Sequence, residues 1–74
     1  MDVIKQETIQ LNDGQTVEIV LYKERSISGI TEYLCNVDGE LWFNVFSCGR
    51  ALVLYDGLKT VLPKYMSNIP NDLI

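Results

Sequence analysis

Apolar and polar residues alternate along the first two thirds of the chain, and the period then changes to that of a helix. Two Asp-Gly pairs, Asp13-Gly14 and Asp38-Gly39, interrupt the alternating stretches, which are rich in Val, Ile, Thr and aromatic residues. Asp-Gly flanked by alternating apolar residues is a strong signal for a β-hairpin. The pattern therefore predicts two hairpins, over residues 1–24 and 30–47, joined by a loop over residues 25–29.

The requirement that apolar sets share a face selects the turn of the first hairpin. A two-residue loop at Asp13-Gly14 would pair Ile9 with Glu18 and send the apolar sets of the two strands to opposite faces. A three-residue loop pairs Ile9 with Val17 and places Gly14 where a left-handed backbone conformation is needed. We therefore predict the three-residue loop with a glycine bulge.

The second hairpin accepts the two-residue loop Asp38-Gly39, which pairs Cys35 with Trp42 and leaves apolar residues on both faces. One set consists of Ile30, Leu34, Leu41, Phe43 and Val45. The other set consists of Tyr33, Cys35, Val37, Trp42 and Phe46. An antiparallel sheet with one covered face normally alternates to polar residues on its other face. We expect the first set to face the core and the second, unusually apolar, set to stay exposed.

Residues 48–66 have the period of an amphipathic α-helix, and Ser47 is a suitable N-cap. On a helical wheel eight apolar residues fall within an arc of about 140°, and Leu52 and Val53 lie outside it. The residues within the arc are Ala51, Leu54, Tyr55, Leu58, Val61, Leu62, Tyr65 and Met66. Gly57 costs a helix about 1 kcal/mol relative to alanine, which packing of the apolar face offsets. Pro63 lacks an amide hydrogen, so we expect the helix to end or kink near Leu62 and residues 67–74 to form an extended tail.

These elements predict an α+β domain. Four antiparallel strands form a meander of two hairpins, and one C-terminal helix packs on one face of the sheet. The alternative is a small all-β barrel, in which Asp56-Gly57 turns a third hairpin between residues 51–55 and 58–62. The 74 residues leave room for a single domain in either case.

Composition and charge narrow the function classes. Ten acidic residues outnumber six scattered basic residues, so a continuous phosphate-binding surface is not expected. The chain contains no histidine, the commonest general base and metal ligand, and its two cysteines are too few for a zinc site. We expect no enzyme activity, no cofactor and no metal. The chain opens without a signal-peptide pattern and its longest apolar run is five residues, so we expect a cytoplasmic protein without membrane contact.

The apolar outer face of the second hairpin favours a role in protein binding. Contiguous exposed apolar patches mark contact surfaces, and Tyr and Trp are enriched at interface hot spots. We predict a non-enzymatic protein-binding module, a small regulator or inhibitor, whose partner is another protein or a second copy of itself in a homodimer. The predicted contact residues are Tyr33, Val37, Trp42 and Phe46, with Leu52 and Val53 on the helix as a secondary surface.

Three alternatives stay open at this stage. Ile27, or Ile69 and Leu73 in the tail, would cover the aromatic face and make it part of the core. A nucleic-acid-contacting module would use Lys23 and Arg25 in the central loop to hold phosphates beside stacking aromatic rings. A thiol enzyme would use Cys48, whose place at the helix start favours the thiolate.

Overall fold

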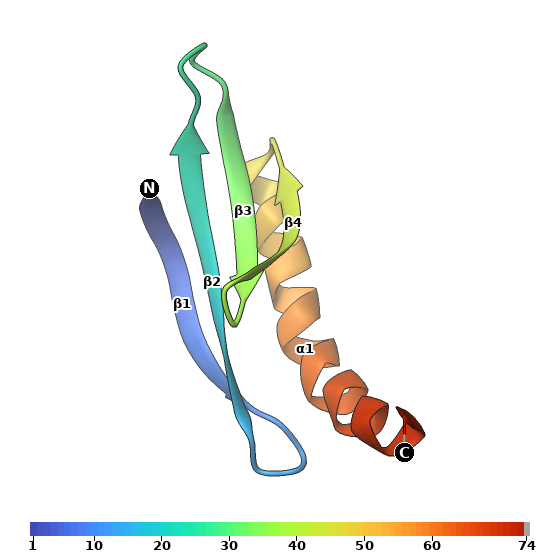
Figure 1. Cartoon of the computed structure of the whole chain (residues 1–74). Coiled ribbons are helices and arrows are strands. Elements are labelled where there is room, and N and C mark those ends of the chain that lie inside the picture. Colours follow the sequence, from blue (N-terminus) through green and yellow to red (C-terminus); the bar gives the residue numbers. More distant parts are fainter. Residues whose placement is uncertain (74) are drawn as a thin grey trace.

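The computed structural model describes the backbone of residues 1–73 and the side chains of residues 1–64. It shows one open antiparallel sheet and one C-terminal helix (Figure 1). The strands, which follow one another across the sheet in chain order, are β1 (Asp2–Gln10), β2 (Thr16–Arg25), β3 (Thr31–Val37) and β4 (Glu40–Val45). Helix α1 (Cys48–Leu73) follows them. The predicted α+β meander is confirmed, and the barrel is excluded.

The loop between β1 and β2 has the predicted three-residue form. Ile9 lies opposite Val17, as the matching of apolar faces requires. The Gly14 amide donates a hydrogen bond to the Leu11 carbonyl (3.1 Å), and Gly14 has a φ of 87°. This left-handed conformation strains any residue with a Cβ, so glycine is the residue that suits the turn.

The Asp38-Gly39 turn also forms as predicted. Both residues have positive φ, 49° for Asp38 and 84° for Gly39, as in the type I′ turns that suit two-residue hairpins. The Glu18 amide donates to Asp38 Oδ1 (2.8 Å), and the Asp38 amide donates to the Glu18 carbonyl (2.8 Å). These two hydrogen bonds tie the turn of the second hairpin to β2 in the first.

The faces of β3 are the reverse of the prediction. Ile19 lies opposite Val37 and Leu21 lies opposite Cys35, and all four side chains are buried on the helix side of the sheet. Tyr33 packs against the same core. Residues directly opposite each other share a face, so the inward residues of β2 determine which residues of β3 point inward. The prediction failed because it assigned faces to the two hairpins separately.

A bulge in β4 shifts the register of the second hairpin. Asn36 lies opposite Leu41 as predicted, but Cys35 lies opposite Phe43 and not Trp42. The extra residue returns Phe43 to the helix side, where it packs against the core as predicted. Leu41, which was expected to face the core, is 56% exposed.

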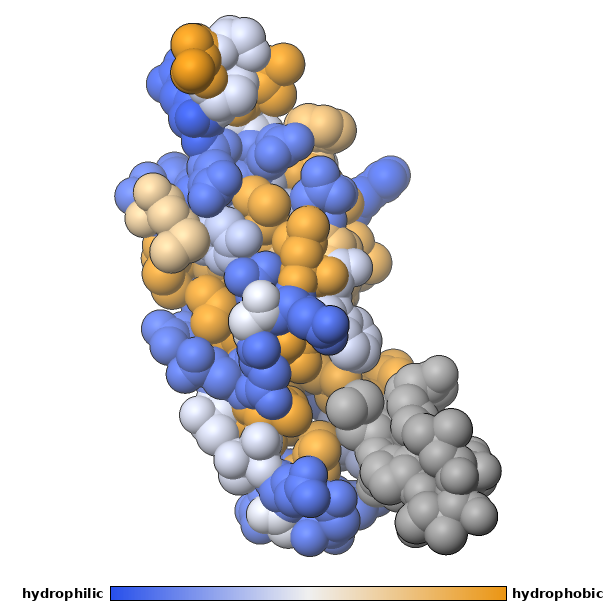
Figure 2. Space-filling model, viewed as in Figure 1, coloured by the Kyte–Doolittle hydropathy of each residue, from blue (hydrophilic) through white to orange (hydrophobic). Residues whose placement is uncertain are grey.

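The sheet face away from α1 is mixed in polarity. Tyr22 lies opposite Leu34 on this face, since both alternate with core residues. The Tyr22 hydroxyl donates to Asn36 Oδ1 (3.4 Å), and Tyr22 is buried between its neighbours. Figure 2 shows apolar side chains interspersed with polar ones over the strands. This face therefore lacks the continuous aromatic patch that was expected.

Helix α1 begins at its predicted cap and continues beyond its predicted end. The Arg50 amide donates to Ser47 Oγ (3.3 Å), the geometry of an N-cap. The helix runs through Pro63, so residues 67–73 are helical and the expected extended tail is wrong. Pro63 removes only one backbone donor, and Leu62 beside it is 1% exposed and holds the helix to the core.

Candidate interaction surface between the helix and edge strand

An apolar groove of about 460 Å³ lies between α1 and β4. The strand contributes one of its lining residues, and the helix contributes the others. The lining residues are Phe43, Val53, Leu54, Gly57, Leu58 and Val61. None of them carries a polar side chain, so the groove offers an apolar contact without a specific polar anchor. We call this feature the α1–β4 groove.

The groove exists because α1 has two adjacent apolar stripes and the sheet covers only one. Ala51 and Tyr55 belong to the covered stripe and are fully buried. Val53, Gly57 and Val61 follow each other at intervals of four residues, which places them on one helix face. Val53 is 72% exposed and Val61 is 53% exposed. The second stripe therefore has no intramolecular partner among the described side chains.

Two groove residues that were expected inside the core are exposed. Leu54 and Val61 fall within the predicted apolar arc, yet Leu54 is 39% exposed. A single helix on a twisted sheet presents only part of a wide apolar arc to the strands, and the rest remains uncovered. Gly57 adds to the opening, because a Cβ built there would meet nothing within 4 Å.

Strand β4 forms one edge of the sheet, and the features that usually protect such an edge are confined to its first half, where Glu40 is charged and Trp42 forms a bulge. Its sequence contains neither Lys nor Pro, which commonly prevent an edge strand from pairing with another chain. The opposite edge, β1, carries Lys5 and Glu7. Trp42 and Phe46, beside the β4 edge, are 41% and 67% exposed. The β4 edge thus combines an unpaired backbone with exposed apolar side chains.

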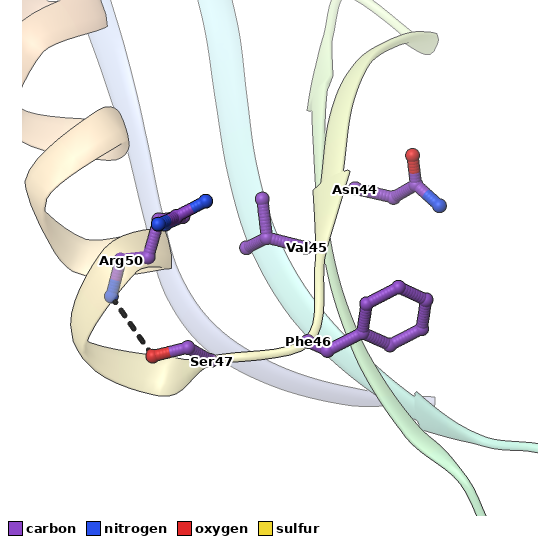
Figure 3. A pocket seen from close by; sticks show the side chains of 5 residues that line it. All are labelled: Asn44, Val45, Phe46, Ser47 and Arg50. Carbon is purple, nitrogen blue, oxygen red and sulfur yellow. Dashed lines mark hydrogen bonds between the residues drawn. The ribbon is translucent and has the colours of Figure 1, made fainter.

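A second hollow lies where β4 leads into α1 (Figure 3). It is lined by Asn44, Val45, Phe46, Ser47 and Arg50. Figure 3 shows Phe46 and Asn44 directed away from the helix, with Val45 and the Arg50 side chain on the helix side. Within residues 1–64, no carboxylate forms an ion pair with Arg50. A cation is therefore available at this end of the edge strand.

A polar cluster fixes α1 on β1 at the far side of the sheet. The Tyr55 hydroxyl donates to Glu7 Oε2 (2.6 Å), and Lys59 Nζ lies 2.9 Å from Glu7 Oε1. The ammonium groups of Lys5 and Lys59 lie 5.7 and 5.8 Å from the centroid of the Tyr55 ring, within range of a cation–π interaction. The cluster anchors the same helix that carries the exposed stripe.

The pKa values of Tyr55 and Glu7 are shifted in opposite directions. Burial, and then the hydrogen bond to Glu7, raises the pKa of Tyr55. The hydrogen bond from Tyr55, and then the contact with Lys59, lowers the pKa of Glu7. At neutral pH the tyrosine is therefore a donor and the glutamate an ionised acceptor. Since Tyr55 is fully buried and its hydroxyl is bonded to Glu7, the cluster holds the helix in place.

The six predicted contact residues divide into two groups. Val37 is 4% exposed and lies in the core, and Tyr33 and Leu52 pack against that core. The expectation that these three face outward is therefore wrong. The exposed residues are Trp42, Phe46 and Val53. Val53 lies in the α1–β4 groove, and the other two lie along β4 or directly after it.

The residues that were proposed to cover the aromatic face lie elsewhere or outside the described side chains. Ile27, proposed as a cover, is fully exposed in the turn between β2 and β3. The side chains of Ile69 and Leu73 lie outside the described residues, as do those of Tyr65 and Met66.

The basic pair Lys23 and Arg25 belongs to β2 and not to a loop. Both residues line a hollow that also contains Asp2 and Glu24. Alternating acidic and basic side chains do not form the continuous positive surface that tracks a phosphate backbone.

The cysteines are both free thiols. Burial raises the pKa of Cys35 to about 11, which leaves this thiol protonated and unreactive at neutral pH. Cys48 is exposed at the start of α1. Among the described residues, no group of three His, Cys, Asp or Glu side chains is placed to hold a metal ion. No helix within that part of the chain is both long and apolar enough to span a membrane.

The chain matches no protein-family model, and comparisons with curated proteins and with solved structures find no match.

Proposed function

We propose that the protein is a non-enzymatic protein-binding module that receives an extended protein segment along the edge of β4. The observation that carries this proposal is the coincidence of two features on one strand. The last three residues of β4 carry neither a charge nor a bulge, and the α1–β4 groove lies beside them on the helix side. Either feature alone would be common on a small protein, but together they provide backbone pairing and side-chain burial for the same ligand.

Strand addition explains how the two features act together. The main chain of the added segment forms hydrogen bonds with β4, and these contribute affinity without depending on sequence. Alternate side chains of the segment point to opposite faces of the sheet. One set enters the α1–β4 groove beside Val53 and Val61, and the other lies beside Phe46 on the opposite face. Specificity comes from how well the first set fills the groove.

A binding module without catalytic groups acts by occupying a surface of its partner, so we propose a role as a small regulator or inhibitor. Free thiols at Cys35 and Cys48 suit a reducing compartment, which supports a cytoplasmic location.

The proposal is tested by comparing which proteins are retained by tagged forms of the chain. The sample is an extract of the native host, which also contains untagged copies of the chain. Val53→Asp places a charge in the groove at a largely exposed position, so the fold is preserved. Thr60→Asp is the matched control, because it makes the same change at an exposed position of α1 outside the groove. Circular dichroism checks that both variants are folded.

We expect at least one protein to be retained by the wild type and by Thr60→Asp but lost with Val53→Asp. The same retained proteins for all three forms, or none for any, would contradict the proposal.

A further inference from the structure

We infer that the segment received at β4 is β4 of a second copy of this chain, so that the protein forms a dimer with a two-fold axis at the paired edges. This inference rests on the proposed function, because it uses the same edge and the same α1–β4 groove. It adds the identity of the ligand. Three observations carry it, namely the faces of β4, the positions of two charged residues and the exposed apolar area.

The faces of β4 match those of its own copy in an antiparallel pair. The bulge at Trp42 leaves residues 43–45 as the regular stretch of the strand. A two-fold axis at Asn44, the centre of this stretch, places Phe43 of one copy opposite Val45 of the other and keeps opposite residues on the same face. Phe43 and Val45 both pack on the helix side, and Asn44 points away from it. The pairing therefore places apolar residues beside apolar residues and polar beside polar.

The same pairing brings the two helices together. Each α1–β4 groove includes Phe43 of the edge strand, so the pairing places the exposed stripes of the two helices on the same face of a continuous eight-stranded sheet. Gly57 lies midway along this stripe between Val53 and Val61. A glycine at the centre of a helix contact lets two helices approach closely. The open space above Gly57 is then filled by the partner copy.

The charges at the two ends of β4 are complementary in this arrangement. Glu40 begins the strand, and Arg50 lies just beyond its other end, lining the hollow with Val45. Antiparallel pairing brings the Glu40 end of one copy against the Arg50 end of the other, twice by symmetry. Neither residue has an ion-pair partner among the side chains of residues 1–64. The two copies would supply each other's missing partner.

The exposed apolar area is close to what a dimer of standard size needs. A standard interface buries about 800 Å² per partner, of which about six tenths, roughly 480 Å², is apolar. The contributing residues are Trp42, Phe46, Val53, Leu54 and Val61, with exposed fractions from 39% to 72%. With ordinary side-chain areas these fractions correspond to roughly 500 Å² per copy.

The inference is tested by the molar mass of the full chain in solution, measured by sedimentation over a concentration series. We expect twice the 8.4 kDa of one chain at the upper concentrations. Val61→Asp, in the groove, gives the single-chain mass, whereas Thr60→Asp beside it keeps the doubled mass. Exchange of the charges provides a rescue test. Glu40→Arg and Arg50→Glu each weaken the dimer about tenfold, and the double variant restores it.

Each adverse outcome has a defined meaning. A single-chain mass at every concentration overturns the dimer. A doubled mass that Val61→Asp leaves unchanged also overturns it, because the contact would then lie on another surface. If the mass is that of one chain but the extract yields a different protein whose retention depends on Val53, the dimer fails and the proposed function stands. If nothing is retained through Val53 and no dimer forms, both fail.

Discussion

Removal of the Tyr55 hydroxyl isolates the hydrogen bond that holds α1 on β1. Tyr55→Phe keeps the buried ring and its packing but loses the donor to Glu7 Oε2 at 2.6 Å. The side chains of Lys5 and Lys59 still lie over the ring. The variant therefore changes one interaction between the helix and the edge of the sheet farthest from β4.

A hydrogen bond from a buried hydroxyl to an ionised acceptor contributes about 1.5–3 kcal/mol to the free energy of unfolding. Water and Lys59 can replace the lost donor, because Glu7 is 39% exposed. We therefore expect Tyr55→Phe to lower the free energy of unfolding by about 1 kcal/mol. For a domain of this size that loss lowers Tm by about 5 °C.

At acidic pH the wild type and Tyr55→Phe should have the same free energy of unfolding. The hydrogen bond from Tyr55 lowers the pKa of Glu7 below its ordinary value of 4.5. A group whose folded pKa is lowered contributes stability above its unfolded pKa and loses it as the pH falls through the folded pKa. The full effect of Tyr55→Phe is thus present at neutral pH, and it disappears below the lowered pKa of Glu7.

The assay is urea unfolding of the wild type and the variant from neutral to acidic pH, followed by circular dichroism. Tyr22→Phe is the control, because its hydroxyl donates to the neutral amide of Asn36 at the longer distance of 3.4 Å. Tyr22→Phe should lower the free energy of unfolding by less than Tyr55→Phe does, and this loss should not change with pH. A Tyr55→Phe effect that is absent at neutral pH, or constant across the pH series, would refute this account of the cluster.

Two further predictions concern the core and the thiols. Leu62→Ala should lower the free energy of unfolding by about 3 kcal/mol, because it opens a cavity at a residue that is 1% exposed. Val61→Ala, next to it and half exposed, should cost less than about 1 kcal/mol, and equal losses in urea unfolding would argue against the observed helix orientation. A thiol reagent at neutral pH should label exposed Cys48 in the folded protein and reach Cys35, with its pKa of about 11, only after unfolding. Equal labelling rates would contradict the burial of Cys35.

Features that depend on neighbouring residues could be predicted from the sequence. Gly14 at the left-handed position, the Asp38-Gly39 turn and the Ser47 cap each involve a few consecutive residues, and all three form as expected. The matching of Ile9 with Val17 also follows from two strands joined by a short loop. In these cases the local backbone geometry leaves few alternatives.

Features that depend on distant parts of the chain could not be predicted. The inward direction of Cys35 follows from its pairing with Leu21 across the five-residue turn between β2 and β3. The bulge at Trp42 falls in a run of three apolar residues, 41–43, and such a run does not show which residue is the extra one. Tyr55 and Glu7 are 48 residues apart, so no spacing rule connects them. The α1–β4 groove was missed for a similar reason, because a helical wheel shows how wide an apolar arc is but not how much of it a sheet covers.

The two edges of the sheet differ in how well they are protected against pairing with another strand. In the proposed dimer the two β4 strands pair with each other, and the two β1 strands become the outer edges of the sheet. Those strands carry Asp2, Lys5 and Glu7 and contain a bulge between Val3 and Lys5, which are features that oppose the addition of a further strand. A contact that closes on itself in this way cannot propagate into fibres. If the copies pair as proposed, assembly therefore stops at two chains, because the edges left on the outside are the more strongly protected ones.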